Sequence, residues 1–178
     1  MAATTVTFTT TENANPVVMK NQAAAGTIKG AAARVEVAAT SLDETDDRVM
    51  ILSIPSNASL VDLTVFNDDL DSDGAPALTM DIGLFYGGGQ RVSGVVKAAG
   101  DVIDDDALAT VITTMQAANT AGVRVLFEAQ DIANIGKPLW EMGGLSSDPG
   151  GNILIGTSVG TAAATAASGT ITMVAKYV

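Results

Sequence analysis

The stretch Leu78-Thr-Met-Asp-Ile-Gly-Leu-Phe-Tyr86 decides the fold of this chain, because its side chains change character at every step. One set is large and apolar and the other is mostly small or polar, namely Leu78, Met80, Ile82, Leu84 and Tyr86 against Thr79, Asp81, Gly83 and Phe85. A period of two is typical of a β-strand that buries one face. We therefore predict a half-buried strand, ended by the turn Gly87-Gly-Gly89.

Similar patterns lie on both sides of this stretch. The further strands predicted from them cover residues 33–39, 48–54, 61–65, 91–98, 123–129, 152–159 and 170–178. The stretch 48–54 is apolar almost throughout, which predicts a strand buried on both faces. In the stretch 61–65, Val61, Leu63 and Val65 are predicted to share one face.

Two segments have the spacing of a helix instead. Leu108, Val111, Ile112 and Met115 would form an apolar stripe on a helix, with Asp104-Asp-Asp106 at its N-terminus. Carboxylates there would cap free amide groups and oppose the positive end of the helix dipole. Lys137-Pro-Leu-Trp-Glu-Met-Gly-Gly144 predicts one short helical turn, and Trp140 is expected to plug the core.

About eight short strands, one short to medium helix and one helical turn favour an all-β fold. Turn signals between the strands indicate two packed antiparallel sheets in a sandwich or jelly roll, and not βαβ units. We predict that residues 31–178 form this sandwich domain. Residues 1–30 are polar and are broken by Pro16, so we predict an extended N-terminal arm.

Four apolar side chains of the arm are candidates for contacts with other subunits: Val6, Phe8, Val17 and Val18. Val6 and Phe8 alternate with threonines, so this stretch is suited to add as a strand to an exposed sheet edge. The alternative is a frayed terminus.

The composition excludes much chemistry. The 178 residues include 20 Asp and Glu, 9 Lys and Arg, no His and no Cys, giving a net charge of -11. Without imidazole or thiol groups there is no His base, no Cys or Ser-His nucleophile pair and no His or Cys metal site. Scattered basic residues in an acidic chain argue against nucleic acid as a partner.

The pattern Asp69-Leu-Asp-Ser-Asp-Gly74 matches the opening of a calcium loop. The twelfth position, where such a loop needs Glu, holds Met80, and the flanks are predicted strands, so a helix-loop-helix site is rejected. A β-loop calcium site through Asp69, Asp71 and Asp73, or a solvated acidic turn, remains open. No other cofactor and no catalytic residue is predicted, because twenty acids make carboxylate pairs by chance.

Several phrases in order resemble small jelly-roll proteins that decorate or cement the heads of tailed bacteriophages. They span residues 31 to 178 and are Ala33-Arg-Val-Glu-Val-Ala-Ala39, Ile54-Pro-Ser-Asn-Ala58, Asn67-Asp-Asp69, Asp81-Ile-Gly-Leu-Phe-Tyr86, Gly136-Lys-Pro-Leu-Trp140 and Gly144-Leu-Ser-Ser-Asp-Pro-Gly-Gly151. The resemblance implies a non-enzymatic β-sandwich on the capsid exterior that binds the major capsid protein, as a homotrimer. It offers no catalytic residues.

From these observations we expect a virion structural protein, assembled in the host cytoplasm, which bridges capsid subunits and stabilises the head lattice. No membrane contact is expected, because no apolar run reaches the ~20 residues of a transmembrane helix. The alternative is a receptor- or glycan-binding module of a tail, a fibre or a head projection. An enzyme on the same scaffold is the least favoured hypothesis.

Overall fold

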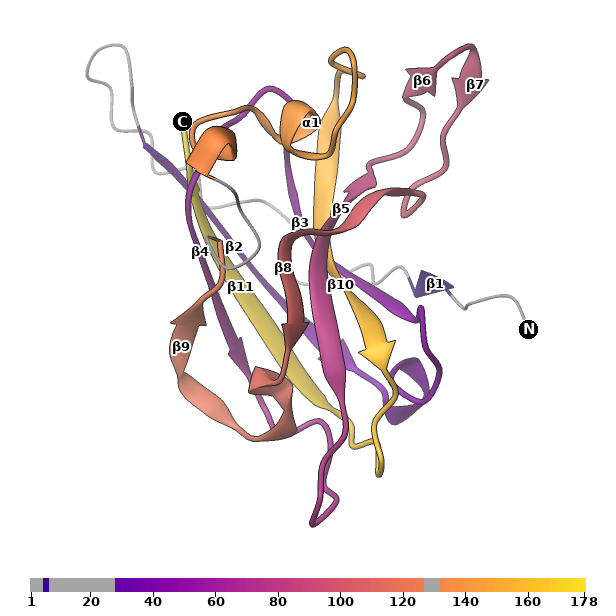
Figure 1. Ribbon diagram of the computed structural model, residues 1–178, viewed down its shortest axis with the longest axis vertical. Coiled ribbons are helices and arrows are strands. Elements are labelled where there is room, and N and C mark those ends of the chain that lie inside the picture. Colours follow the sequence, from indigo (N-terminus) through magenta and orange to yellow (C-terminus); the bar gives the residue numbers. More distant parts are fainter. Residues whose placement is uncertain (1–4, 7–27, 127–131) are drawn as a thin grey trace.

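Two packed β-sheets make up the molecule (Figure 1). The computed structural model describes residues 5–6, 28–126 and 132–178. Its long strands are β2 (Lys29–Val37), β3 (Arg48–Pro55), β4 (Leu60–Asn67), β5 (Thr79–Tyr86), β8 (Val102–Ile112), β9 (Asn119–Arg124), β10 (Asn152–Thr161) and β11 (Gly169–Tyr177). The short elements are β1 (Thr5–Val6), β6 (Arg91–Val92), β7 (Val95–Val96), α1 (Leu139–Met142) and 3-10 turns at Ala39–Ser41, Thr114–Gln116 and Ile132–Asn134.

The strand order is that of a jelly roll. One sheet has the order β1-β3-β10-β5-β8 and the other β2-β11-β4-β9, while β6 and β7 pair separately. All pairs among the long strands are antiparallel. Chain neighbours such as β2 and β3 therefore lie in opposite sheets, the interleaving expected of two Greek keys. This confirms the predicted all-β sandwich.

The core lies between the sheets and takes every second side chain of the regular strands. In β11, Ile171, Met173, Ala175 and Tyr177 are buried, as their alternation predicted. Residues 49–52 of β3 are all buried, which fits the prediction of a strand covered on both faces. After residues 7–27, which lie outside the described ranges, the first strand is β2, which begins at Lys29.

The helix predicted after Asp104-Asp-Asp106 is wrong, because these residues belong to β8. Leu108, Ile112 and Met115 are buried as the stripe required, but Val111 is 63% exposed and has a φ of 52°. Three register shifts against β5 insert extra residues into β8, and they produce a spacing that imitates a helix. Pairing with β5 therefore overrides the helical pattern, and the aspartates cap no helix.

Smaller differences also have local causes. Val61 is 38% exposed and does not share the face of Leu63. The reason is a bulge in β4: consecutive residues of β11 pair with Asp62 and then with Leu60, so Val61 has no partner in the ladder. The strand predicted at 91–98 is a hairpin of β6 and β7 around Ser93-Gly94, both with positive φ. The strand predicted at 123–129 ends at Arg124, and residues 127–131 lie outside the described residues.

The predicted turn at 137–144 is confirmed as α1. Leu139 is fully buried there, whereas Trp140 is half-buried and packs against the rim of the core instead of plugging it. No helix in the described ranges is long and apolar enough to span a bilayer.

Candidate functional site

The arm candidates are placed only in part. Thr5 and Val6 form β1, which pairs in parallel with β3 through Thr5↔Arg48 and Val6↔Val49. The start of the arm therefore pairs with a sheet edge of its own chain, and its contact with other subunits stays a prediction. Phe8, Val17 and Val18 lie outside the described residues.

The loop 69–74 is organised around a buried carboxylate. Asp71 is 1% exposed and accepts four backbone hydrogen bonds. Its Oδ2 accepts from the N–H groups of Ala77 (2.7 Å), Leu78 (2.9 Å) and Ala164 (3.0 Å), and its Oδ1 from Thr165 (2.9 Å). Burial alone would raise the pKa of Asp71, but the four donors hold it well below its ordinary value. The side chain of Asp71 therefore connects the start of β5 to the loop that links β10 and β11.

The other two calcium candidates also face protein donors. Asp69 Oδ1 accepts from the N–H of Asp71 (3.2 Å), while Asp73 accepts from the N–H of Ala75 (2.9 Å) and from the hydroxyl of Thr165 (3.0 Å). Asp69, Asp71 and Asp73 do not form a cluster of oxygens within 4.8 Å of one another. We therefore propose that the loop is a structural turn.

On this basis we expect calorimetric titration of the protein with calcium to give no binding heat from the loop. Asp71 already has four donors around its two oxygens, so a cation would have to displace them. Asp73→Asn is the informative variant, because Asp73 is exposed and its loss leaves the four bonds of Asp71 in place. A saturable heat that disappears in Asp73→Asn would establish the calcium site instead.

Carboxylates converge closely at a different place, within β8. The side chains of Asp104, Asp105 and Asp106 have oxygens within 4.8 Å of one another, the only such group of three in the described part of the chain. Asp104 pairs with Leu84 of β5, and the register shifts before Ala109 pairs with Ile82, so Asp105 and Asp106 bulge out of the ladder and the three side chains converge instead of alternating. Such a group has the oxygen ligands of a hard cation, and it also favours a shared proton.

Of the two possible occupants of this carboxylate group, a shared proton is better supported than a metal cation. Burial, the hydrogen bond and charge of Asp106, and the charge of Asp105 raise the pKa of Asp104 to about 6. A carboxyl with this pKa holds its proton well above the pH at which ordinary aspartates lose theirs.

We expect Asp104→Asn to stabilise the protein at pH 7 by about 1 kcal/mol, less than the full shift implies because solvent screens a partly exposed group. The folded pKa lies above the ordinary 3.8, so the folded state binds the extra proton between pH 4 and 6 and wild-type stability falls as pH rises through that window. Asn imitates the protonated form and removes this fall. Urea unfolding at pH 4, 5, 6 and 7 measures the free energy of unfolding of wild type and Asp104→Asn, and Asp43→Asn, at an exposed position, is the control. Parallel pH curves for wild type and Asp104→Asn would contradict the prediction.

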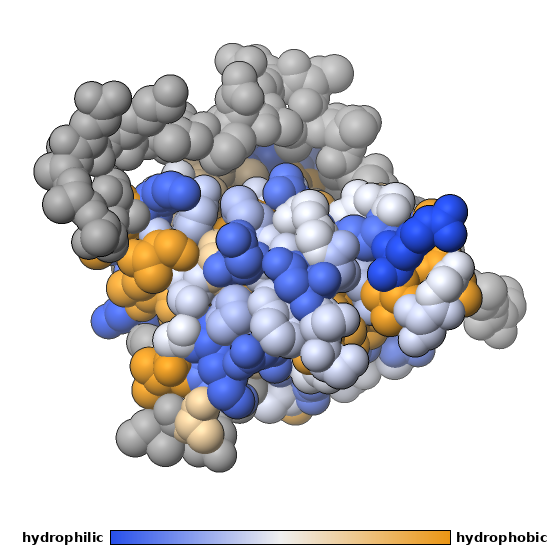
Figure 2. All heavy atoms as spheres, turned by 90° about the horizontal axis from the view of Figure 1, so that it is seen from above, coloured by the Kyte–Doolittle hydropathy of each residue, from blue (hydrophilic) through white to orange (hydrophobic). Residues whose placement is uncertain are grey.

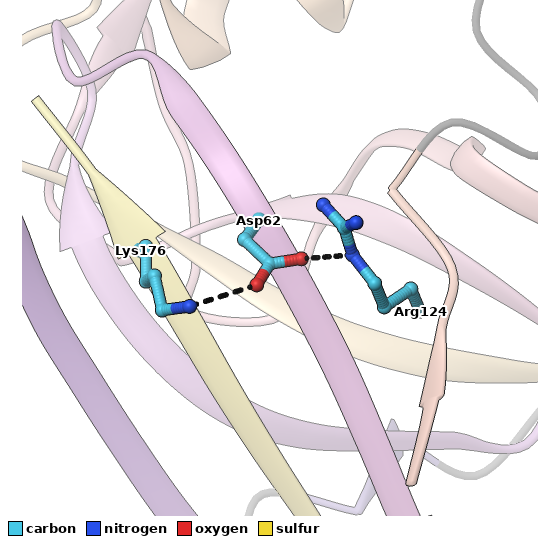
Figure 3. Close-up of polar contacts among 3 residues, drawn as sticks. All are labelled: Asp62, Arg124 and Lys176. Atoms are coloured by element: carbon cyan, nitrogen blue, oxygen red, sulfur yellow. Dashed lines mark hydrogen bonds and ion pairs between the residues drawn. The ribbon is translucent and has the colours of Figure 1, made fainter.

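The outer face of the four-stranded sheet carries an ion bracket centred on Asp62 (Figure 3). Asp62 Oδ1 lies 2.7 Å from Arg124 Nε and Oδ2 lies 3.1 Å from Lys176 Nζ, so β4 is tied to both β9 and β11. Partial burial raises the pKa of Asp62, but the hydrogen bonds and charges of Arg124 and Lys176 outweigh it and lower that pKa. Both cations are largely exposed, so the bracket adds little stability and mainly keeps this face from being acidic.

Exposed apolar side chains gather on the hairpin of β6 and β7, which projects from one end of the sandwich (Figure 1). Val95 and Val96 are 59% and 53% exposed. Figure 2, which shows this end from above, has a hydrophilic centre with hydrophobic groups at its margins. Sequence reasoning did not single out the hairpin, although Arg91-Val-Ser-Gly-Val-Val96 contains a two-residue turn between valines.

Comparisons with known proteins show the same fold in phage particles. No protein-family model and no curated protein matches this chain. A chain from the capsid of Ralstonia phage GP4 is 21% identical, with a TM-score of 0.58, covering 87% of this chain and 86% of that chain. A chain from the capsid asymmetric unit of cyanophage Pam1 is 19% identical, with a TM-score of 0.57, covering 89% and 93%. At this identity the likeness shows a shared fold.

Proposed function

We propose that this chain is a non-enzymatic structural protein of a phage virion that decorates or cements the outer surface of the capsid. The observation that carries the proposal is the overlap of nearly the whole sandwich with chains of two phage capsids. The resemblance of its sequence phrases to head decoration proteins points the same way. The partners proposed are the major capsid protein and further copies of the chain, as a homotrimer on the capsid exterior.

The side chains support a structural role. The chain has no His and no Cys, so the commonest general base and the commonest strong nucleophile are both missing. Its buried carboxylate Asp71 is held by backbone donors, which leaves it no proton to transfer near neutral pH. What the surface offers is a projecting apolar hairpin and strand edges, and these are suited to binding protein.

The proposed mechanism is the sum of modest contacts. Each copy would bury the tip at Val95 and Val96 against a neighbouring subunit and use its arm to reach a second one. Burying two valines contributes only a few kcal/mol per copy. Many copies on one lattice, each held at two points, oppose the opening of joints in the shell far more effectively than any single contact.

The test is binding of the purified full chain to expanded heads that lack it, measured by co-sedimentation. We expect saturable binding, and we expect virions without the protein to lose resistance to heat and osmotic shock. Val95→Ser together with Val96→Ser should weaken binding, whereas Val123→Ser, an exposed valine in β9, is the matched control. Failure to bind, with normal resistance of virions lacking the protein, would refute the proposal. Glycan-array binding without capsid affinity would favour a receptor-binding module instead.

Deleting residues 2 to 25 should leave the sandwich folded but weaken attachment to heads or to other copies. Among the described residues, the deleted part supplies the two-residue strand β1, and the eight long strands of the sandwich are all retained. Thermal unfolding checks the first half of the prediction and co-sedimentation the second. If cooperative unfolding disappears, the arm belongs to the core of the fold.

A further inference from the structure

The edges of the two sheets differ in how well they are protected against pairing. Unpaired N–H and C=O groups on an edge strand attract other strands, and proteins usually block them with bulges, short strands or prolines. In the described part of the chain, β8 is broken by three register shifts, β9 has six residues and one shift, and β3 is covered by β1, has one shift and ends at Pro55. Three edges are therefore protected.

Among the described residues, the fourth edge, β2, lacks such devices. It pairs with β11 over nine consecutive residues without a register shift. The ladder runs from Lys29 opposite Tyr177 to Val37 opposite Gly169. It contains no proline and stands at the outside of its sheet. Ala31, Val35 and Val37 are buried in the core, which fixes the strand and the face that each residue takes. The result is a long edge strand with regular pairing along its whole length.

This edge carries a charge pattern that complements itself. Arg34 and Glu36 are both exposed and lie on the outer face, one on each side of Val35. The guanidinium of Arg34 contacts the Thr170 hydroxyl (3.2 Å), and the Glu36 carboxylate has no hydrogen-bond or ion-pair partner among the described residues. If two copies of β2 run antiparallel with Val35 opposite Val35, Arg34 of each copy faces Glu36 of the other. Opposite charges directly across a ladder are stabilising.

We propose that β2 is a two-fold interface at which a second copy of this chain joins its own β2, extending both four-stranded sheets into one. Residues 33 to 37 of each copy form the ladder, with about four new backbone hydrogen bonds and two Arg34–Glu36 pairs. The location suits an acidic protein. Two copies of charge -11 repel each other, whereas β2 contributes Lys29, Arg34 and Glu36, that is 2 minus 1, or +1. This two-fold contact is separate from the contacts within the proposed homotrimer, and the inference does not depend on the proposed capsid role.

Charge reversal tests both the contact and its register. Arg34→Glu and Glu36→Arg each place like charges opposite each other twice, so each should raise the dissociation constant of self-association at least about tenfold in sedimentation velocity at low salt. The double variant Arg34→Glu/Glu36→Arg restores two opposite pairs and should associate as wild type does. Mixing the two single variants should give a mixed dimer more readily than either alone.

The controls separate the interface from folding. Both side chains are exposed, so thermal unfolding of dilute samples should be nearly the same for all variants. Because the chain has no cysteine, Arg34→Cys mixed with Glu36→Cys should form a disulfide between the two variants under mild oxidation. A wild-type chain that is monomeric at about 1 mM, or association that ignores the single reversals or is not rescued by the double variant, would overturn the proposal.

Discussion

Replacing Asp71 by Asn is expected to lower the free energy of unfolding by about 3 kcal/mol, because at least one buried backbone N–H then faces an amide group that donates instead of accepting. The carboxylate now receives four donors, three on Oδ2 and one on Oδ1. Two of them, the N–H groups of Ala164 and Thr165, lie 93 and 94 residues from Asp71 in the chain. The variant therefore loosens the loop between β10 and β11 from the start of β5, and the melting temperature should fall by about 6–12 °C.

Asp69→Asn is the matched control, because it removes a charge from the same loop without removing a buried acceptor. Asp69 is exposed and accepts one hydrogen bond, at 3.2 Å from the Asp71 N–H, which the amide oxygen of Asn can keep. We expect a change below about 0.5 kcal/mol in urea unfolding. Equal losses in Asp69→Asn and Asp71→Asn would show that the charge of the loop, and not the four bonds, stabilises it.

The pH dependence of the Asp71 effect has a definite sign. The pKa of Asp71 is lower in the folded protein than in the unfolded chain. Its contribution to the free energy of unfolding is therefore complete above the ordinary aspartate pKa of 3.8, and it is lost as the pH falls towards the lower pKa of the folded state. The difference between wild type and Asp71→Asn should therefore be constant from pH 5 to 7 and shrink below pH 4. Asp104 has the opposite effect: because its pKa is raised, the stability of the wild-type protein falls as the pH rises from 4 to 6.

The sequence predicted most of the sheet framework, because burial of one face imposes a period of two on any regular strand. β5 and β11 have this period and were placed correctly, but β5 is not half-buried as predicted: residues 82–86 are buried on both faces, and Phe85, predicted on the opposite face, is fully buried. In β8 the same burial acts on a strand with inserted residues, so Leu108 and Ile112, followed by Met115 in the next 3-10 turn, reach the core at helix-like intervals. Three of the four stripe residues are buried, Val111 is exposed, and the element was wrong, because period alone cannot distinguish a helix from a bulged strand.

The partners of the acidic residues could not be predicted. The motif at 69–74 identified a loop in which carboxylates matter, but it gave no sign that Asp71 binds Ala164 and Thr165. Those donors lie in a stretch of Ala, Thr and Gly without periodicity, and only the fold brings the two segments together. Likewise, the alternation of residues 33–37 predicted a strand but not that it would form a sheet edge, because edges are set by the order in which distant strands pair.

Gly83→Ala should cost about 3 kcal/mol of stability, the second large effect expected in this protein. A methyl group at Gly83 would overlap the main chain of Asp105, since the bulge of β8 packs directly over the central residue of β5. The atoms in contact are main-chain atoms of Asp105, which cannot move aside as the end of a flexible side chain would. The added methyl group must therefore push the bulge outward and disturb the pairing of β5 with β8 on both sides of it.

Gly74→Ala separates this contact from the ordinary effect of losing a glycine. Gly74 is exposed, nothing lies within 4 Å of the added methyl group, and its φ is outside the left-handed region, so the variant should be neutral or more stable by up to about 1 kcal/mol. Gly83→Ala has a second signature, because displacing Asp105 separates the three carboxylates of β8. The loss of stability between pH 4 and 6 that Asp104 causes in wild type should then flatten. A Gly83→Ala protein with wild-type stability and an unchanged pH profile would show that β8 does not pack against Gly83.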